Sequence, residues 1–397
     1  MQAVILAGGK ATRLGALTGG LPKPLVPVGD KPFIHYLIAA LRRHGFCDIE
    51  LLVGPFTAAY RAALGDGAAL GVRLTLIAEE PPADTAGALS LAAPYLGERF
   101  LMLNGDSFLD FNLLDLATRD DGEPWLARLA LREVADVGRY GAVRLEGEHV
   151  AAFGEKAASG RGLMNGGVYW LKRDILGEIG APPVSMERDV LPRLAARGLV
   201  RAAVYDGRFI DIGTPEDLAR AATLLPQWET RPAAFLDRDG VLNRDSGYVH
   251  RAADFVWIDG AQQAVKRLND AGWLVFVVTN QAGIARGLYQ PADVETLHRW
   301  INEELARTGA HIDAFYFCPH HPEGTAPGYG VVCDCRKPAP GMLLQAMRAW
   351  PVRRETSFMI GDKDIDLAAA TAAGVRGMLF DAGQNLDAVV AAALAGR

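Results

Sequence analysis

Features typical of membrane and secreted proteins are missing from this sequence of 397 residues. It contains no run of about 18 uncharged apolar residues, so a membrane span is not expected. Its first residues, MQAVILAGGK, have no basic stretch before the apolar one. That pattern is typical of a buried strand entering a glycine turn rather than of a signal peptide. We therefore expect a cytoplasmic protein with no membrane partner.

An excess of basic residues is also lacking. The net charge is −6, whereas nucleic-acid binding usually needs a basic face, so no nucleic-acid partner is expected. The negative net charge is compatible with small anionic substrates, because lysines and arginines near a site can make the local potential positive in a mildly negative protein. With 50% apolar and 22% charged residues the composition is that of a globular protein, and the length favours two or three domains. A homo-oligomer is compatible with all of this.

Cysteine is scarce, and its distribution is uneven. Of the four cysteines, Cys318, Cys333 and Cys335 crowd into one short stretch, while Cys47 stands alone. In a reducing compartment such crowding favours a metal site over a disulfide.

What the sequence does contain is an alternation of apolar runs and helical patterns. AVILA, IELLV, RLTLI and RFLML indicate strands, and helical patterns lie between them. The alternation restarts after residues 226–232 with AAFLDRDGVL, WLVFVVTN and SFMIGD. Low-complexity segments and an internal repeat are absent. We therefore predict an α/β protein with two doubly wound domains, residues 1–228 and 232–397.

The first candidate site follows the first strand. Gly8 and Gly9 would let backbone N–H groups cradle a phosphate, and Arg13 would neutralise its oxygens. Lys23, between two prolines, offers a second cation for a triphosphate. A tight strand-to-helix turn is the alternative for the glycines alone.

LAGGKATRL followed by LPKPLVPVGDKP resembles the signature of the sugar-1-phosphate nucleotidyltransferases, over roughly residues 1 to 228. The resemblance implies a glycosyltransferase-A-like fold, with Arg13 and Lys23 as catalytic cations. It also implies that Asp106 and Asp211 bind Mg²⁺, which offsets charge on the α-phosphate and pyrophosphate. Ala11 stands where the family has a third glycine.

The same resemblance assigns further binding residues. A carboxylate beside the base would suit the N1 and N2 donors of guanine. The nucleotide-binding positions are Gly8, Gly9, Thr12, Glu80, Thr85 and Gly87, and the sugar-contacting positions are Asn104, Glu155, Lys156 and Asn165.

The second candidate site begins with Asp237 and Asp239. At i and i+2 of an extended segment both carboxylates can face one phosphate, and together they call for a cation such as Mg²⁺. Asp237 would attack phosphorus, and Asp239 would protonate the leaving oxygen and later activate water. In isolation, an Asp-Arg-Asp-Gly turn is the alternative.

Three later segments complete this pattern. Thr279 and Asn280 can hold phosphate oxygens, Arg336 and Lys337 supply positive charge, and Asp362 is a metal-ligand candidate. This order resembles the haloacid dehalogenase superfamily, most closely its D,D-heptose 1,7-bisphosphate phosphatase and histidinol-phosphatase group, over roughly residues 232 to 385.

That resemblance implies a capless, Rossmann-like domain with an open site. Asp237 would be the nucleophile, Asp239 the acid/base, Thr279 and Lys337 phosphate anchors. The Mg²⁺ ligands would be Asp237, Asp239 and Asp362. The substrate pocket would be lined by Asp245, Ser246, Gly247, Tyr248, Asn280, Gln281, Ala282, Arg336 and Lys363.

The crowded cysteines and a nearby imidazole form a set suited to structural Zn²⁺. Cys318, Cys333 and Cys335 would be joined by His320, because Cys-x-His is the spacing of the resembling family, and His321 is the second choice. Four protein ligands leave no position for water, so the zinc would not be catalytic. Free core cysteines and a disulfide are the alternatives.

Together, the two resemblances predict consecutive steps in nucleotide-activated heptose synthesis. The C-terminal domain would remove the 7-phosphate of a heptose 1,7-bisphosphate, and the N-terminal domain would couple heptose 1-phosphate to an NTP, with GTP favoured. One alternative is a hexose-1-phosphate nucleotidyltransferase fused to a histidinol-phosphatase-like enzyme. Another is a phosphatase with a degenerate, nucleotide-sugar-sensing N-terminal domain.

Overall fold

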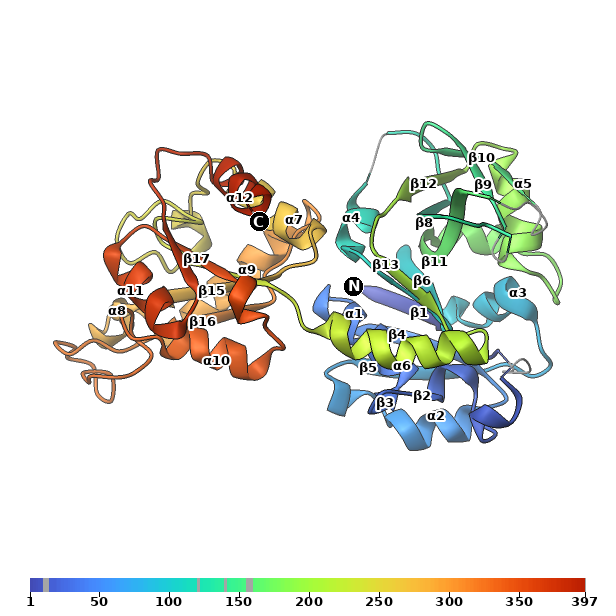
Figure 1. Ribbon diagram of the computed structural model, residues 1–397, viewed down its shortest axis with the longest axis horizontal. Helices are drawn as coiled ribbons and strands as arrows, with labels where there is room; N and C mark the ends of the chain where they lie inside the picture. Colours follow the sequence, from blue (N-terminus) through green and yellow to red (C-terminus); the bar gives the residue numbers. More distant parts are fainter. Residues whose placement is uncertain (10–13, 120–121, 139–140, 155–159, 397) are drawn as a thin grey trace. The chain divides into compact units, whose positions relative to one another are not determined.

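The computed structural model describes residues 1–9, 14–119, 122–138, 141–154 and 160–396 (Figure 1). The chain divides into two compact units, Met1–Gln227 and Trp228–Arg397. Among the described residues, no helix has the length and apolar character needed to span a bilayer.

The first unit, blue to yellow-green in Figure 1, is built on a nine-stranded mixed sheet with the order β5-β4-β1-β6-β11-β8-β12-β10-β9. Strands β5, β4, β1 and β6 are parallel, as the alternating pattern predicts, whereas β11 is antiparallel to both β6 and β8. The strands are β1 (Gln2–Leu6), β4 (Asp48–Gly54), β5 (Arg73–Ala78), β6 (Arg99–Asn104), β8 (Ala127–Val134), β9 (Val143–Glu146), β10 (His149–Phe153), β11 (Gly162–Lys172) and β12 (Val200–Val204).

Two small antiparallel pairs accompany this sheet, β2 (Pro27–Val28) with β3 (Lys31–Pro32) and β7 (Ser107–Asp110) with β13 (Arg208–Asp211). The first helix buries Phe33, Leu37 and Leu41, a spacing that places them on one apolar stripe. The helices are α1 (Phe33–Arg43), α2 (Thr57–Leu64), α3 (Asp84–Leu91), α4 (Leu113–Thr118), α5 (Leu191–Ala195) and α6 (Pro215–Glu229).

The second unit, yellow to red in Figure 1, contains a fully parallel five-stranded sheet with the order β16-β15-β14-β17-β18. Its three central strands, β15, β14 and β17, are buried and apolar, as expected for a sheet covered on both faces, whereas the edge strands β16 and β18 are partly exposed. The strands are β14 (Ala233–Leu236), β15 (Leu274–Asn280), β16 (Ala314–Cys318), β17 (Phe358–Gly361) and β18 (Arg376–Leu379).

Helices cover both faces of this sheet. Ala234 and Leu236 of β14 pack with α7, α9 and α12, whereas Ala233 and Phe235 pack with α10 and α11, so successive side chains enter opposite cores. Because the strands are parallel, all their carboxyl ends meet at one edge, where α/β sheets bind ligands. The helices are α7 (Ala261–Asp270), α8 (Ala282–Ala285), α9 (Pro291–Ala306), α10 (Gly341–Ala349), α11 (Asp364–Ala373) and α12 (Leu386–Ala395).

Candidate active sites

A cavity of ≈ 360 Å³ opens at the carboxyl edge of the second unit's sheet. Asp237 directly follows β14, and Thr279 and Asn280 end β15, so neighbouring strands deliver them to the same place. The cavity is lined by Asp237, Asp239, Asp245, Gly247, Tyr248, Thr279, Asn280, Gln281, Ala282, Tyr289, Lys337, Lys363 and Ile365. Of the residues expected in this pocket, Ser246 and Arg336 are not among the lining side chains.

Asp237 and Lys337 form a buried ion pair at the floor of this cavity. Lys337 Nζ lies 2.8 Å from Asp237 Oδ1 and 2.7 Å from Asp366 Oδ1, and it donates to the Val278 carbonyl. Burial raises the pKa of Asp237 to about 6, although the ammonium of Lys337 opposes this shift. The arrangement holds the Asp237 carboxylate in place beside a fixed positive charge.

Three carboxylates meet at this point. Oxygens of Asp237, Asp362 and Asp366 all lie within 4.8 Å of one another. Asp362 Oδ1 is buried without a hydrogen-bond partner among the described residues, and burial raises the pKa of Asp362. Gly240 lies so close to Asp362 that a Cβ would collide with its carboxylate. Clustered carboxylates with an unpartnered oxygen fit a hard divalent cation such as Mg²⁺.

The Asp239 carboxylate has a different environment from the one expected of a metal ligand. It accepts hydrogen bonds from Arg238 at 2.8 Å, from Asn243 at 3.0 Å and from Gln281 at 2.9 Å. It lines the cavity, but the three-carboxylate group contains Asp366 instead. Asp366 also accepts the Lys363 N–H at the start of α11, at 3.1 Å.

Asn280 binds the backbone of the loop that carries Lys337. Its Nδ2 donates to the Lys337 carbonyl at 3.1 Å, and its Oδ1 accepts the Lys337 N–H at 3.0 Å. These two hydrogen bonds hold the loop in place. They also occupy the side-chain amide of Asn280, a residue that the sequence suggested as a substrate contact. Arg336 donates to the His320 carbonyl at 3.1 Å.

An ion pair lies at the mouth of the cavity. Lys363 Nζ is 3.1 Å from Asp245 Oδ2 and 3.4 Å from Asp362 Oδ2, with about half of the lysine side chain exposed. Tyr248, on the same loop as Asp245, is also exposed. These side chains are available at the entrance to contact the part of a substrate that extends beyond its phosphate.

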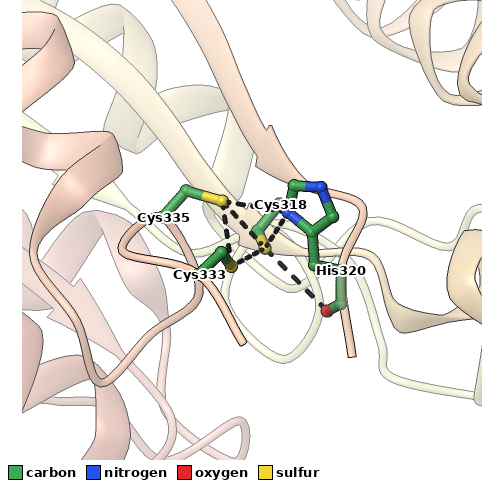
Figure 2. Close-up of side chains that lie close together, drawn as sticks. All are labelled: Cys318, His320, Cys333 and Cys335. Atoms are coloured by element: carbon green, nitrogen blue, oxygen red, sulfur yellow. Dashed lines mark hydrogen bonds between the residues drawn. The ribbon is translucent and has the colours of Figure 1, made fainter. Parts of the chain in front are cut away.

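Three cysteines and a histidine converge beside β16 (Figure 2). Cys335 Sγ lies 3.2 Å from Cys318 Sγ and 3.3 Å from Cys333 Sγ, and His320 Nδ1 lies 3.4 Å from Cys335 Sγ. The four ligand atoms all fall within 4.8 Å of one another. Three sulfurs and one imidazole nitrogen are a donor set that fits tetrahedral Zn²⁺.

In the first unit a cavity of ≈ 500 Å³ lies at the ends of β1 and β6. Lys23 Nζ is 2.7 Å from Asp106 Oδ2, and both residues line this cavity. Gly105 lies so close to β1 that a Cβ would stand 2.5 Å from the Leu6 carbonyl oxygen. The lining residues are Leu6, Gly8, Gly9, Lys23, Pro24, Leu52, Gly54, Pro55, Glu79, Pro82, Asp84, Thr85, Ala88, Asn104, Gly105, Asp106 and Glu187.

Asp211 reaches the same neighbourhood through β13. The Ile212 N–H donates to the Asp106 carbonyl at 3.0 Å, and Asp211 Oδ1 accepts the Gly213 N–H at 2.7 Å. A Cβ on Gly213 would lie 2.9 Å from Asp211 Oδ1 and 3.6 Å from Lys23 Nζ. The β7–β13 pair therefore brings Asp211 close to Lys23, although Asp211 is not among the lining residues.

The carboxylate that lines this cavity belongs to Glu79 and not to Glu80, the residue expected from the sequence. Glu79 is buried and lines the cavity, with its Oε1 accepting the Ala83 N–H, whereas Glu80 is exposed. Successive side chains of an extended segment point in opposite directions, so a shift of one residue changes which carboxylate faces the cavity. Gly87 is buried in α3, where a Cβ would stand 3.2 Å from the Pro182 side chain, so it serves packing.

Glu187 is a cavity residue that the sequence reasoning missed. Its carboxylate accepts hydrogen bonds from Thr85 at 3.1 Å and from Tyr169 at 2.9 Å. Asn165 donates to the Tyr169 hydroxyl at 2.8 Å, and therefore reaches the cavity only through this chain. Glu187 lies in a π-helical turn, Met186–Val190, and a single glutamate there gives no recognisable sequence signal.

The expected positions Thr12, Arg13, Glu155 and Lys156, together with Ala11, lie outside the described residues.

Comparison with known proteins gives matches to each unit separately. The family model described as nucleotidyl transferase matches residues 2–227, and the one described as HAD-hydrolase-like matches residues 334–395. The D-glycero-beta-D-manno-heptose-1,7-bisphosphate 7-phosphatase of Rhodopseudomonas palustris is 49% identical over 160 residues, which cover 40% of this chain and 88% of that protein. The enzyme of the same description from Escherichia coli K12 is 49% identical over 144 residues, 36% of this chain and 75% of its own.

Among solved structures, the first unit is similar to HddC from Yersinia pseudotuberculosis complexed with GMP-PN. The identity is 30% and the TM-score 0.51, and the match covers 56% of this chain and 99% of that one.

Proposed function

The chain belongs to the nucleotidyl transferase family through its first unit and to the D-glycero-beta-D-manno-heptose-1,7-bisphosphate 7-phosphatases through its second, and we propose that the two units act in sequence on one sugar. The chain is a bifunctional enzyme of nucleotide-activated heptose synthesis. Its second unit dephosphorylates a heptose 1,7-bisphosphate, and its first unit couples the resulting heptose 1-phosphate to a nucleotide. We propose GTP as the nucleotide.

The observation that supports the phosphatase reaction best is the convergence of Asp237, Lys337 and Thr279 on one cavity. Asp237 would attack the phosphorus of the 7-phosphate, forming an O–P bond while the bond from phosphorus to the C7 oxygen breaks. Asp239 would give its proton to that departing oxygen. Asp239 would then take a proton from water, which hydrolyses the aspartyl-phosphate and releases inorganic phosphate.

The carboxylates of Asp237, Asp362 and Asp366 would hold Mg²⁺, which neutralises part of the charge on the phosphoryl group. The ammonium of Lys337, which contacts Asp237, would bind phosphate oxygens. Cys318, His320, Cys333 and Cys335 would hold a structural Zn²⁺. Cys335 is two residues from Lys337, so this ion would fix the loop that positions the lysine.

In the first unit, the phosphate of heptose 1-phosphate would attack the α-phosphorus of the nucleotide, with pyrophosphate leaving. Asp106 and Asp211 would bind Mg²⁺, which offsets the charge that develops on these phosphates. Lys23 already pairs with Asp106 and is placed to contact phosphate oxygens. The preference for GTP is supported by the likeness to HddC with GMP-PN and by a carboxylate, Glu79, in the cavity.

A direct test incubates the full chain with heptose 1,7-bisphosphate, Mg²⁺ and each of the four common NTPs, using both anomers of the sugar. Mass spectrometry and a phosphate assay follow the products. The proposal expects phosphate release from one anomer and formation of GDP-heptose in preference to the other nucleotide sugars. Phosphate release without any nucleotide sugar would instead favour a sensing role for the first unit, and an equally rapid reaction with another NTP would exclude the preference for GTP.

A further inference from the structure

A buried chain of hydrogen bonds runs along the wall of the phosphatase cavity. Tyr289 donates from its hydroxyl to Gln281 Oε1 at 2.7 Å. Gln281 Nε2 in turn donates to Asp239 Oδ2 at 2.9 Å and to Thr279 Oγ1 at 2.9 Å. Gln281, Thr279 and Tyr289 are all buried, with only 2% of Gln281 exposed. Both ends of the glutamine amide are therefore engaged by protein groups.

The direction of these hydrogen bonds follows from chemistry. An ionised Asp239 can only accept, so the amide group that faces it must be the NH₂ of Gln281. The carbonyl oxygen of the amide then faces Tyr289, whose hydroxyl must donate. Gln281 cannot flip without placing its oxygen against the carboxylate, which would leave buried acceptors facing each other.

The orientation of the Gln281 amide also determines the direction of the Thr279 hydroxyl. Because Thr279 Oγ1 accepts a hydrogen bond from Gln281, its own hydrogen is free to point elsewhere. Thr279 lines the cavity, so that hydrogen can be donated to a phosphate oxygen. One amide therefore orients both the residue proposed as acid/base and a donor proposed for the phosphate.

The surrounding packing holds the backbone of Gln281 and the ring of its partner Tyr289. The backbone N–H of Gln281 donates to the Cys318 carbonyl at 2.8 Å, which ties the residue to the end of β16. The Tyr289 ring stacks on His250, with centroids 4.6 Å apart and planes 13° apart. Gly283 lies directly against the same ring, where a Cβ would collide with it. The Gln281 backbone and the Tyr289 ring are therefore both held in place.

We propose that Gln281, oriented by the Tyr289 hydroxyl, is a positioning residue for phosphoryl transfer and not a substrate contact. The proposal rests on the phosphatase function assigned above to this cavity. Gln281 acts by holding the Asp239 carboxylate and by keeping the Thr279 hydroxyl as a donor toward phosphate. Tyr289 acts only through Gln281, because its hydroxyl bonds to the amide oxygen.

A double-mutant cycle tests this coupling. Tyr289→Phe removes one hydroxyl and keeps the ring, Gln281→Met keeps the length of the side chain, and the third variant combines them. Gln281→Glu keeps the shape of the side chain but cannot donate from an ionised carboxylate. Tyr316→Phe, which alters a half-buried tyrosine on β16, is the matched control. Phosphate release by the full chain is measured with heptose 1,7-bisphosphate and, separately, with p-nitrophenyl phosphate.

The proposal expects Gln281→Met and Gln281→Glu to lower kcat about 10- to 100-fold with KM changed less than about threefold. Tyr289→Phe should lower kcat about 3- to 10-fold alone and have no further effect beside Gln281→Met, since coupled residues are not additive. Tyr316→Phe should behave as the parent protein.

Parental values of kcat in the Gln281 variants would overturn the proposal, as would a raised KM at unchanged kcat, which marks a substrate contact. Fully additive effects would separate Tyr289 from Gln281 and overturn it as well. If the parent protein cleaves p-nitrophenyl phosphate but not the heptose bisphosphate, only the assignment of the sugar substrate is wrong. The double-mutant cycle is then evaluated from the kcat values for p-nitrophenyl phosphate.

Discussion

Lys337 Nζ lies 2.8 Å from Asp237 Oδ1, in an ion pair whose lysine side chain is 1% exposed. The same ammonium also bonds Asp366, so one cation offsets two buried carboxylates. Paired in this way, the charges tolerate burial that would be costly for either carboxylate alone. The ion pair thus connects the stability of the second unit with the chemistry proposed for its cavity.

Replacing this lysine should destabilise the second unit strongly. Lys337→Met leaves Asp237 and Asp366 buried without their cation, at a cost of about 3–5 kcal/mol in the free energy of unfolding. Urea denaturation followed by circular dichroism measures this change. Lys363→Met is the matched control, because its pair with Asp245 is half exposed and should contribute no more than about 1 kcal/mol. Added Mg²⁺ should recover part of the loss at Lys337, and equal effects of the two substitutions would contradict the argument.

The two activities should separate by mutation. Asp237→Asn removes the proposed nucleophile and should lower phosphate release about 10³-fold or more, while nucleotide-sugar formation from heptose 1-phosphate continues. Asp106→Asn should have the reverse effect, because it alters only the first cavity. Each activity is measured with its own substrate on the same protein preparation. Loss of both activities in either variant would show that the two cavities are not independent.

The strand-end residues of the second unit could be predicted because parallel strands deliver their carboxyl ends to one edge. Asp237 and Thr279 line one cavity for that reason, and Lys337 joins them from the loop between β16 and α10. The crowded Cys318, Cys333 and Cys335 converge with His320. In the first unit, the apolar runs correspond to β1, β4, β5 and β6.

Single side-chain directions could not be predicted in this way. Glu79 rather than Glu80 faces the cavity of the first unit, and Asp366 rather than Asp239 joins the carboxylate group. A one-residue step in an extended segment reverses the direction of a side chain, which separates Glu79 from Glu80. The Asp239 carboxylate is held instead by hydrogen bonds from Arg238, Asn243 and Gln281, which the motif does not record. Tyr289 was not predicted, because no motif marks its hydrogen bond to Gln281.

Zinc removal should impair the phosphatase and spare the transferase. Cys333→Ser, or treatment with a strong zinc chelator in excess Mg²⁺, should remove a bound zinc ion and release the loop that carries Lys337. Phosphate release should fall about 10- to 100-fold, the range seen when support for a site is lost. Zinc content is measured by atomic absorption beside both activities. Cys47→Ser, at an exposed cysteine in the first unit, is the control and should keep zinc and activity. Full phosphatase activity in zinc-free protein would refute the structural role.

His298 should make the second unit less stable in mild acid. Burial in α9, followed by the positive charge of Arg238, lowers its pKa from 6.5 to about 3. Below about pH 6.5 the unfolded chain therefore binds a proton at this histidine that the folded protein does not bind. The contribution of His298 to the free energy of unfolding is fully present above this pH and decreases as the pH falls toward 3. At pH 5 the loss should be about 2 kcal/mol. Thermal unfolding between pH 7.5 and 5 measures it, and His298→Leu should have the shallower slope. Identical slopes would assign the acid sensitivity to other groups.

Nucleotide choice should depend on Glu79. The N1 and N2 groups of guanine are donors, and Glu79 Oε1 already accepts the Ala83 N–H, which leaves Oε2 as an acceptor at the cavity wall. Glu79→Gln replaces part of this acceptor with an NH₂ group that would face the guanine donors. The ratio of kcat/KM for GTP to that for ATP should therefore fall about 10- to 100-fold. Glu80→Gln changes the exposed neighbour in the same way, so it should leave the ratio unaltered. A loss of GTP preference in Glu80→Gln, with none in Glu79→Gln, would mean that in the nucleotide complex the segment presents the other carboxylate to the base.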